Sequence, residues 1–397
     1  MHMKRLKSLA FVYASIFSLL IGLGAGIFLT ISSELISLFW SKQALSHPGL
    51  LLLQCLLFGL VIGLLQLKVG AYPKTIKQIL AEFQKTGKVE GASWRTWVNG
   101  TVILAGGASV GPEASMTGII FRQSSAMGQQ LTNYLTDPDL PQAPFKEQFK
   151  ALFRPLTPAE GPLKAVFAKK WRQKASYIIW TCLGMCSFVM WLKSFPEAKV
   201  FQIGFAEVKW TWQGVLLTPL AFALGLAFGK FFLKFEEIGA KLGETIPNYL
   251  LKGMLGGLLL GISGLLSSYL LWSGAFTMWD LVDQAGKLGP VFLISLAFGK
   301  CLLTNFGFGL GWRGGTIFPA IFCSVALGLG LALLLPWSQN LLVAVLTAAS
   351  VSVIVGKPKL VALLLVFLFS LRLAPVIILV CLLWEKIPQG KRLFPRK

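Results

Sequence analysis

The sequence predicts an all-helical protein that crosses a membrane several times. Of its 397 residues, 55% are hydrophobic and 13% are charged, whereas about a quarter of a soluble domain is charged. Uncharged apolar runs, such as residues 50–67 and 254–272, are long enough to cross roughly 30 Å of hydrocarbon. We therefore expect an all-α polytopic membrane protein.

The first apolar stretch, residues 6–40, predicts a tilted membrane helix that the mature protein keeps. It is too long for a signal peptide, and no small-residue cleavage site follows a short apolar core. Lys4, Arg5 and Lys7 precede it, and such cations mark the cytoplasmic side of a span. The basic tail at 391–397 indicates the same side for the C-terminus. The expected protein is multi-pass, lies in the plasma membrane and has both termini in the cytoplasm.

The net charge of +21 does not indicate a nucleic-acid partner. Most of the basic excess lies in short loops between apolar runs, which is the pattern of positive cytoplasmic loops and of contact with anionic lipid. We therefore expect membrane lipid as a partner and no nucleic acid. A positive field also favours an anionic substrate.

Nothing in the sequence indicates an enzyme or a bound cofactor. The six cysteines all lie within apolar segments, where a buried thiol usually behaves as a small hydrophobe. Cys182 and Cys186 are four residues apart, a spacing that a metal can use, but no histidine accompanies them. No nucleotide-binding loop and no nucleophile–base pair is present. We expect no disulfide, metal, cofactor or catalytic residue.

The first half of the chain contains a second crossing and then a glycine-rich interruption. After the crossing at 50–67, Gly70 and Pro73 open a short amphipathic helix that is too polar to span. The segment from Ser93 runs into glycines at 106–111, where a new helix begins. The other expected elements are that helix at about 112–131, a polar loop and short helix at 136–174, a span at 177–192, and an extramembrane hairpin or loop at 199–212.

The second half repeats this layout. Glycine clusters at 106–111 and 311–315 each follow an apolar run and each precede a helix with proline near its start. Matching interruptions in two halves point to the binding site of an inverted-repeat transporter, although close helix packing is an alternative use of such glycines. The expected spans are 214–232, 250–272, 291–306, 316–335 and 341–355, followed by two short broken helices at 360–371 and 375–384.

These patterns predict how the chain is divided. The first half of the membrane domain, with its central polar loop, is expected at 1–175. Its last span and the connecting loop follow at 176–212, and the second inverted repeat at 213–397. No soluble domain is expected after residue 384.

Glu113 is the residue that most needs a function, because a carboxylate in so hydrophobic a segment is costly. A helix that starts within a membrane has unpaired N–H groups and partial positive charge at its first turn, and nearby glycines let an anion approach them. Pro112 and Pro319 cost little near such helix starts. Two helix starts that face one point would form an anion site. Stabilisation of a helix dipole by Glu113 is the alternative.

Two motifs resemble the signatures of the CLC family of voltage-gated chloride channels and chloride–proton antiporters. GGASVGPEAS resembles the G-K/R-E-G-P region, and GKCLLTNFGFGLGWRGGTIFPAIF resembles a Lys- and Thr-bearing helix followed by G-G-x-F-x-P. Order, spacing and flanking helices match over most of residues 5–385. The resemblance implies a CLC-like inverted repeat of tilted and broken helices, in a short prokaryotic-type member without CBS domains. It also implies a homodimer that passes chloride or a similar small anion, with one pore in each subunit.

The resemblance assigns the site residue by residue. Glu113 matches the gating glutamate, whose carboxylate occupies an anion position and moves away when it is protonated or displaced. Lys300 and Arg313 flank the second motif and are expected to raise the local anion potential, or Lys300 satisfies carbonyl groups at a helix end. The expected anion-binding residues are Gly111, Pro112, Ala114, Gly315, Thr316, Ile317, Phe318, Pro319 and Gly70.

Several positions depart from the family pattern. The first motif has Pro112 in place of Arg or Lys, Ala114 in place of Gly and Ser115 in place of Pro. The central Phe of the second motif falls on Ile317, which backbone N–H binding tolerates. Gly70 stands where the anion-binding Ser of a third motif, G-S-G-x-P, is expected. The filter tyrosine of the last helix has no counterpart, since the C-terminal segment contains no tyrosine.

The proton pathway of the family's exchangers also lacks its expected acid. The matching stretch, GPLKAVFAKKWRQK, has Lys169, Lys170, Trp171 and Arg172 in that region, and a cation at neutral pH does not relay protons as a carboxylate does. These residues favour uncoupled, channel-like conduction. A proton-coupled chloride or fluoride antiporter is the alternative, and a transport-inactive structural or regulatory membrane subunit is an alternative of another class.

Overall fold

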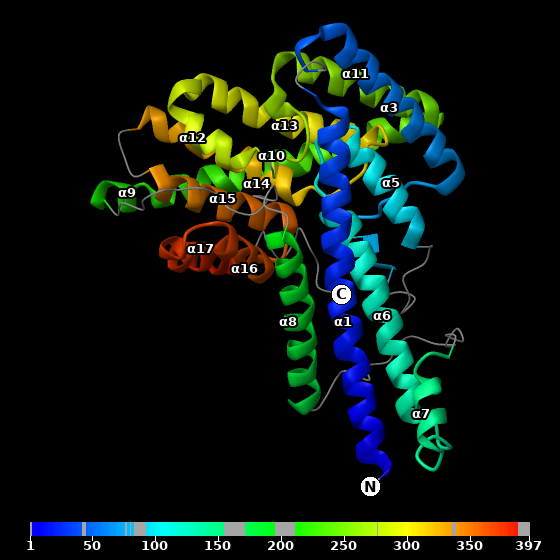
Figure 1. Cartoon of the computed structure of the whole chain (residues 1–397). Helices are drawn as coiled ribbons and strands as arrows, with labels where there is room; N and C mark the ends of the chain where they lie inside the picture. Colours follow the sequence, from blue (N-terminus) through cyan, green and yellow to red (C-terminus); the bar gives the residue numbers. More distant parts are fainter. Residues whose placement is uncertain are drawn as a thin grey trace. The chain divides into compact units, whose positions relative to one another are not determined.

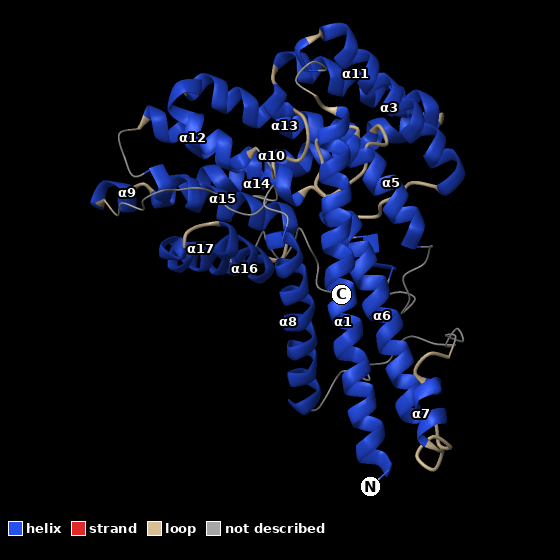
Figure 2. Ribbon diagram, viewed as in Figure 1, coloured by secondary structure: helices blue, strands red, loops and turns tan. Residues whose placement is uncertain are grey.

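The computed structural model describes residues 2–41, 45–75, 78–79, 81–82, 93–154, 171–194, 211–275, 277–335 and 339–387. All the extended regular elements of this described part are helices (Figures 1 and 2), which confirms the expected all-helical fold. They are α1 (His2–Phe39), α3 (Pro48–Val69), α5 (Ser93–Ala105), α6 (Glu113–Thr136), α7 (Phe145–Ala151), α8 (Trp171–Ser194), α9 (Trp212–Leu216), α10 (Thr218–Thr245), α11 (Tyr249–Leu266), η1 (Ser268–Leu270), α12 (Met278–Leu288), α13 (Pro290–Gly309), α14 (Ile317–Leu334), α15 (Gln339–Val355), α16 (Pro358–Leu368), η2 (Leu371–Leu373) and α17 (Ala374–Lys386).

Seven helices of the described part have the length and apolar composition needed to cross a membrane. This agrees with a multi-pass membrane protein. The candidate spans are Met3–Phe39, Pro48–Val69, Ala175–Ser194, Thr218–Thr245, Tyr249–Leu266, Pro290–Gly309 and Ile317–Leu334. The last two helices, α16 and α17, are short, as the sequence predicted.

Some expected boundaries were wrong. The span expected at 250–272 ends at Leu266, because the chain turns into η1 and then reaches Trp272, which has a left-handed φ of 54°. Helix α6 begins at Glu113 rather than at Pro112 and runs to Thr136. Helix α12 was not predicted, because its acidic residues were interpreted as solvated residues at the ends of neighbouring spans. The elements expected at 155–170 and 199–210 lie outside the described residues.

The described chain packs into two compact units that are interleaved along the sequence. One unit contains Met1–Glu34, Pro73–Thr101 and Ala114–Ala198, and the other contains Leu35–Tyr72, Val102–Glu113 and Lys199–Lys397. Below, the first is called the three-helix unit, after its three long helices α1, α6 and α8, and the second is called the filter unit, because it contains both glycine clusters. The division of the sequence into halves at residue 213 stays a prediction.

The core of the filter unit lies around α14 and α15, whose side chains are nearly all buried. Buried hydroxyls between them are paired, with 2.5 Å between the Oγ atoms of Ser324 and Ser350. Helix α3 packs on α11 through glycines. A Cβ on Gly59 would lie 2.3 Å from the carbonyl oxygen of Gly253, so the two backbones approach too closely for any side chain, as is typical of membrane helix pairs.

The three-helix unit is built on α1, with α6 and α8 alongside it (Figure 1). Helices α1 and α8 run parallel, since Ser187 Oγ donates to the Leu19 carbonyl at 2.7 Å and Trp191 Nε1 donates to Thr30 Oγ1 at 3.0 Å. Helix α6 runs the opposite way, with Met127, Leu131 and Tyr134 packed against the first turns of α1. Helix α7 is fixed at the same end by the buried side chain of Gln148, which accepts a hydrogen bond from Arg5 Nε at 3.0 Å.

Candidate anion site

The site is formed by the Glu113 carboxylate and the first turn of α14, and all of it lies in the filter unit. Glu113 Oε1 accepts hydrogen bonds from the N–H of Ile317 at 2.7 Å and of Phe318 at 3.2 Å. The first N–H groups of a helix have no acceptor within the helix, and the helix dipole gives them partial positive charge. The carboxylate therefore occupies the position that an anion would take at this helix start.

The second carboxylate oxygen has no partner. Glu113 Oε2 is buried and accepts no hydrogen bond within the described residues. A buried carboxylate oxygen without a donor is costly, since desolvation of a polar group is offset only by hydrogen bonds. Hydrogen bonds thus stabilise one carboxylate oxygen and not the other, as expected of a side chain that moves away from this position.

Two glycines enclose the carboxylate. Gly111 and Gly315 form an antiparallel bridge, in which the N–H of each donates to the carbonyl of the other at 2.7 and 2.8 Å. A Cβ on Gly111 would lie 1.8 Å from Glu113 Oε2, and a Cβ on Gly315 would lie 2.0 Å from Glu113 Cδ. No other residue type fits beside the carboxylate at either position. The bridge thereby joins the two glycine clusters at 106–111 and 311–315, called the glycine strips below, which lie about 200 residues apart in the sequence.

The bridge is supported by polar contacts next to it. Ser109 and Thr304 lie side by side, with 3.0 Å between their hydroxyl oxygens, and the Thr304 hydroxyl donates to the Ser109 carbonyl at 2.9 Å. Both residues line a void of about 10 Å³, together with Trp312, and this is enough space for one water at most. The Gln66 side-chain amide donates to the Gly311 carbonyl. Each contact fixes backbone that leads directly into a glycine strip.

Lys300 is completely buried, and its ammonium group donates hydrogen bonds to loop carbonyls. Its Nζ donates to the carbonyl oxygens of the four consecutive residues 269–272, at 2.8, 3.1, 3.0 and 2.8 Å. It also lies 4.8 Å from the centre of the Phe322 ring. An ammonium group has three protons, so these four acceptors share all of its donors. Lys300 thus orders the loop that follows α11.

That loop is connected to the first glycine strip. The N–H of Trp272 donates to the Gly107 carbonyl at 2.8 Å, and its ring packs against that of Trp40 with 5.3 Å between centroids. Trp40 Nε1 in turn donates to the Ala105 carbonyl at 2.7 Å. Gly107 has a φ of 86°, and a Cβ there would lie 2.3 Å from the Trp40 ring. The turn that ends α5 is therefore held from two sides.

The structure places the other expected site residues as follows. Thr316 precedes α14 and makes no side-chain cap, and Pro319 is buried in the first turn. The Arg313 guanidinium lies 4.8 Å from the Phe308 ring centre. Gly70 ends α3, where its N–H donates to the Gln66 carbonyl at 3.0 Å. Pro112 and Ala114 are buried neighbours of Glu113 along the chain.

Some residues of this region were missed by sequence reasoning. Gln66, Ser109, Thr304, Trp40 and Trp272 all support the strips, yet none was singled out. A signal existed for Gln66, which is a polar residue inside the apolar run 50–67. The described residues hold no group of three His, Cys, Asp or Glu side chains that would bind a metal ion.

The sequence matches one protein family and a set of transport proteins. A family model described as voltage gated chloride channel matches residues 165–383. The YfeO proteins of Salmonella typhimurium and Salmonella enteritidis, whose name assigns them provisionally to ion transport, are each 25% identical to this chain over 244 residues. The match covers 57% of the chain and 55% of each relative, so it spans about half the length of these relatives.

Solved structures of two antiporters share the fold. A CLC-type fluoride/proton antiporter superposes with a TM-score of 0.64 at 18% identity, over 93% of each chain. A slow cyanobacterial Cl⁻/H⁺ antiporter superposes with a TM-score of 0.67 at 18% identity, over 98% of this chain and 95% of the other. At such low identity the likeness establishes the fold alone, and the predicted CLC-like arrangement of helices is confirmed.

Proposed function

The chain belongs to the voltage-gated chloride channel family, and from this premise we propose that it passes chloride or a similar small anion through a pore gated by Glu113. The observation that carries the proposal is the carboxylate of Glu113 on the N–H groups of Ile317 and Phe318. These donors are backbone groups of a rigid helix, so they require no reorganisation when an anion replaces the carboxylate. The family transports ions, and we expect no enzymatic activity.

The gating step follows from the contacts of the carboxylate. When Glu113 turns away, two N–H groups at a helix start are freed, and a chloride ion accepts their hydrogen bonds in its place. The glycines at 111 and 315 leave room for the ion, because they place no side chain against it. The ion is held without a cationic side chain, which keeps binding weak enough for release.

Proton coupling is the property on which two versions of this function differ. We favour uncoupled conduction, since lysine and arginine stand where the exchangers of the family carry an inner acid, and the last helix has no tyrosine. The stretch with Lys169, Lys170 and Arg172 lies outside the described residues or has no described side chains. A proton-coupled exchanger of chloride or fluoride is the second candidate, supported by the two solved antiporters of the same fold.

A flux measurement tests the proposal. Purified protein in liposomes should release chloride down its gradient, and Glu113→Gln and Glu113→Ala should change the rate. Glu244→Gln serves as a control, because this carboxylate is exposed at the end of α10. Absence of halide flux in every variant refutes the proposal. If a proton gradient drives chloride or fluoride against its own gradient, the protein is an exchanger. If the reversal potential does not change with pH, it is a channel.

A transport-inactive membrane subunit is the remaining candidate of a different class. It is favoured by Gly70, which offers no hydroxyl at the position of the family's anion-binding serine. A stably folded protein that binds no halide in calorimetry would support this candidate. We further propose that the active form is a homodimer with one pore per subunit and with both termini in the cytoplasm.

A further inference from the structure

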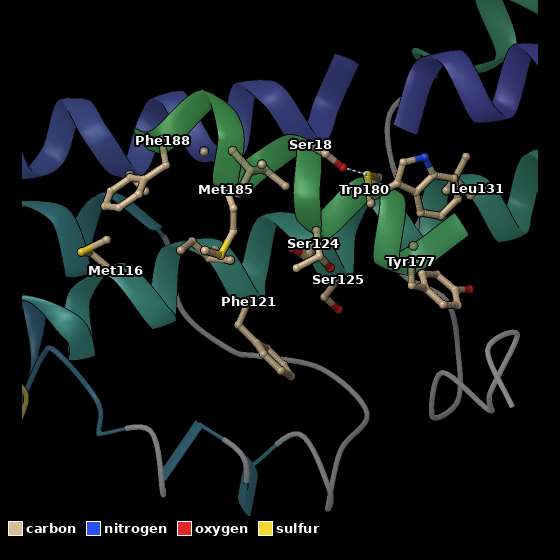
Figure 3. A pocket seen from close by; sticks show the side chains of 18 residues that line it. Ser18, Met116, Phe121, Ser124, Ser125, Leu131, Tyr177, Trp180, Met185 and Phe188 are labelled. Atoms are coloured by element: carbon tan, nitrogen blue, oxygen red, sulfur yellow. Dashed lines mark hydrogen bonds between the residues drawn. The ribbon is translucent and has the colours of Figure 1, made fainter. Parts of the chain in front are cut away.

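The three-helix unit contains a long cavity that the anion site does not use. It has a volume of about 830 Å³ and lies between α6 and α8, with α1 as its floor. Figure 3 shows Trp180 and Leu131 at one end of it and Phe188 and Met116 at the other. Most of its lining is apolar, and the serine and threonine hydroxyls are few. This volume is within the range of roughly 300–1,000 Å³ found for ligand sites.

The cavity exists because α6 and α8 are both fastened to α1, on different faces of it. Helix α8 presses against α1 at glycines, and a Cβ on Gly22 would lie 2.0 Å from the Gly184 carbonyl oxygen. Helix α6 meets α1 through apolar contacts and through one weak hydrogen bond, in which Ser18 Oγ donates to Met127 Sδ at 4.0 Å. Two helices that are held by a third in this way leave a groove between them.

The groove has the length of one membrane leaflet. Along α8 it extends from Tyr177 to Phe188, which is about 16 Å at 1.5 Å per residue. One leaflet contributes half of roughly 30 Å of hydrocarbon. Water does not stabilise an apolar groove, because it finds few hydrogen-bond partners there. An empty groove costs its lining side chains their dispersion contacts. A lipid acyl chain fills such a groove along its whole length.

One end of the groove carries polar and cationic groups. The Trp180 indole Nε1 is buried there, beside Tyr177, and has no hydrogen-bond partner among the residues that the structure describes. The Trp180 ring lies 5.8 Å from that of Phe11, and Lys7 is exposed one turn before Phe11 on the same face of α1. Tryptophan and tyrosine mark the headgroup level of a bilayer, and cations there attract anionic lipid.

We propose that this cavity binds one acyl chain of an anionic phospholipid, with the headgroup at the Trp180 end. The Trp180 N–H then donates to an oxygen of the ester or phosphate region. Lys7 lies about 6 Å further along the axis of α1 than Phe11 and pairs with the phosphate. Lys4, which is exposed in the first turns of α1, adds to the same field.

Native mass spectrometry of the purified full chain tests this proposal. The protein is titrated with phosphatidylglycerol or with phosphatidylcholine that carries the same acyl chains. Ser124→Phe fills the groove, and Leu135→Phe is the control on an exposed position of α6. Lys7→Gln removes a cation without changing the groove, and Lys287→Gln removes an exposed cation on α12 as its control.

We expect one phosphatidylglycerol per wild-type chain, bound in preference to phosphatidylcholine. Ser124→Phe should bind neither lipid at this site, and Lys7→Gln should bind phosphatidylglycerol about fivefold more weakly, as expected for one cation near an anionic headgroup. Both controls should behave as wild type. A wild-type protein that retains neither lipid, for instance because a second copy of the chain covers the groove, overturns the proposal. Equal binding of both lipids that Lys7→Gln leaves unchanged overturns it as well.

Discussion

Replacing Glu113 by alanine should raise the affinity of the site for chloride. The carboxylate accepts hydrogen bonds of 2.7 and 3.2 Å from two backbone N–H groups, and hydrogen bonds to a charged group contribute about 1.5–3 kcal/mol each. An incoming chloride ion therefore competes against about 3–6 kcal/mol of stabilisation. Since 1.4 kcal/mol corresponds to a factor of ten, the alanine variant should bind chloride about 10² to 10⁴ times more tightly.

Glutamine at the same position should give an intermediate affinity. Its amide oxygen has the shape to accept the same two hydrogen bonds, but neutral hydrogen bonds contribute only about 0.5–1.5 kcal/mol each. Wild type should therefore bind chloride most weakly, Glu113→Gln more tightly, and Glu113→Ala most tightly.

Isothermal titration calorimetry with chloride at neutral pH measures this order. Glu244→Ala is the matched control, because it removes an exposed carboxylate that lies on α10, and it should bind chloride as wild type does. Equal dissociation constants for wild type, Glu113→Gln and Glu113→Ala would refute the reasoning. A glutamine variant that binds more tightly than the alanine variant would refute it too.

Two further substitutions test the surroundings of the carboxylate. In the Glu113→Ala background, Gly315→Ala should abolish chloride binding, because its Cβ would fall 2.0 Å from the position of the Glu113 Cδ atom. The control Gly307→Ala should retain binding, because its Cβ meets nothing within 4 Å. If both double variants bind chloride, the ion lies elsewhere. Lys300→Met leaves four loop carbonyls without their donor, and each buried unsatisfied group costs about 1–3 kcal/mol. Thermal unfolding should therefore occur at a much lower temperature than in the exposed-site control Lys287→Met, and equal melting temperatures would contradict the role assigned to this lysine.

The helices were largely predictable because local composition decides them in a membrane. Uncharged apolar runs give the spans around α3, α13 and α14, and proline and glycine mark where α6 and α14 begin. The end of α11 was not predictable. The run 254–272 stays uncharged throughout, but Lys300, distant in sequence, binds the carbonyls of 269–272 where the chain leaves the helix. A contact of this kind leaves no periodic pattern in the sequence.

The candidate site was predictable in its residues but not in its geometry. Glu113 and the two glycine strips stand out as a carboxylate and flexible backbone in apolar surroundings. The direct pairing of Gly111 with Gly315 did not follow from either strip, because a bridge between segments about 200 residues apart depends on how α3, α11 and α13 pack. For Lys300 the sequence left two roles open, and the structure places its ammonium on loop carbonyls rather than on the carboxylate site.

The central claim is that the Glu113 carboxylate occupies the position of a permeating anion. Anomalous diffraction from crystals of Glu113→Ala grown in bromide tests it most directly. We predict a bromide peak within hydrogen-bond distance of the N–H groups of Ile317 and Phe318, between Gly111 and Gly315, and no such peak in the wild type. Bromide bound elsewhere in the variant, with that position empty, would contradict the claim.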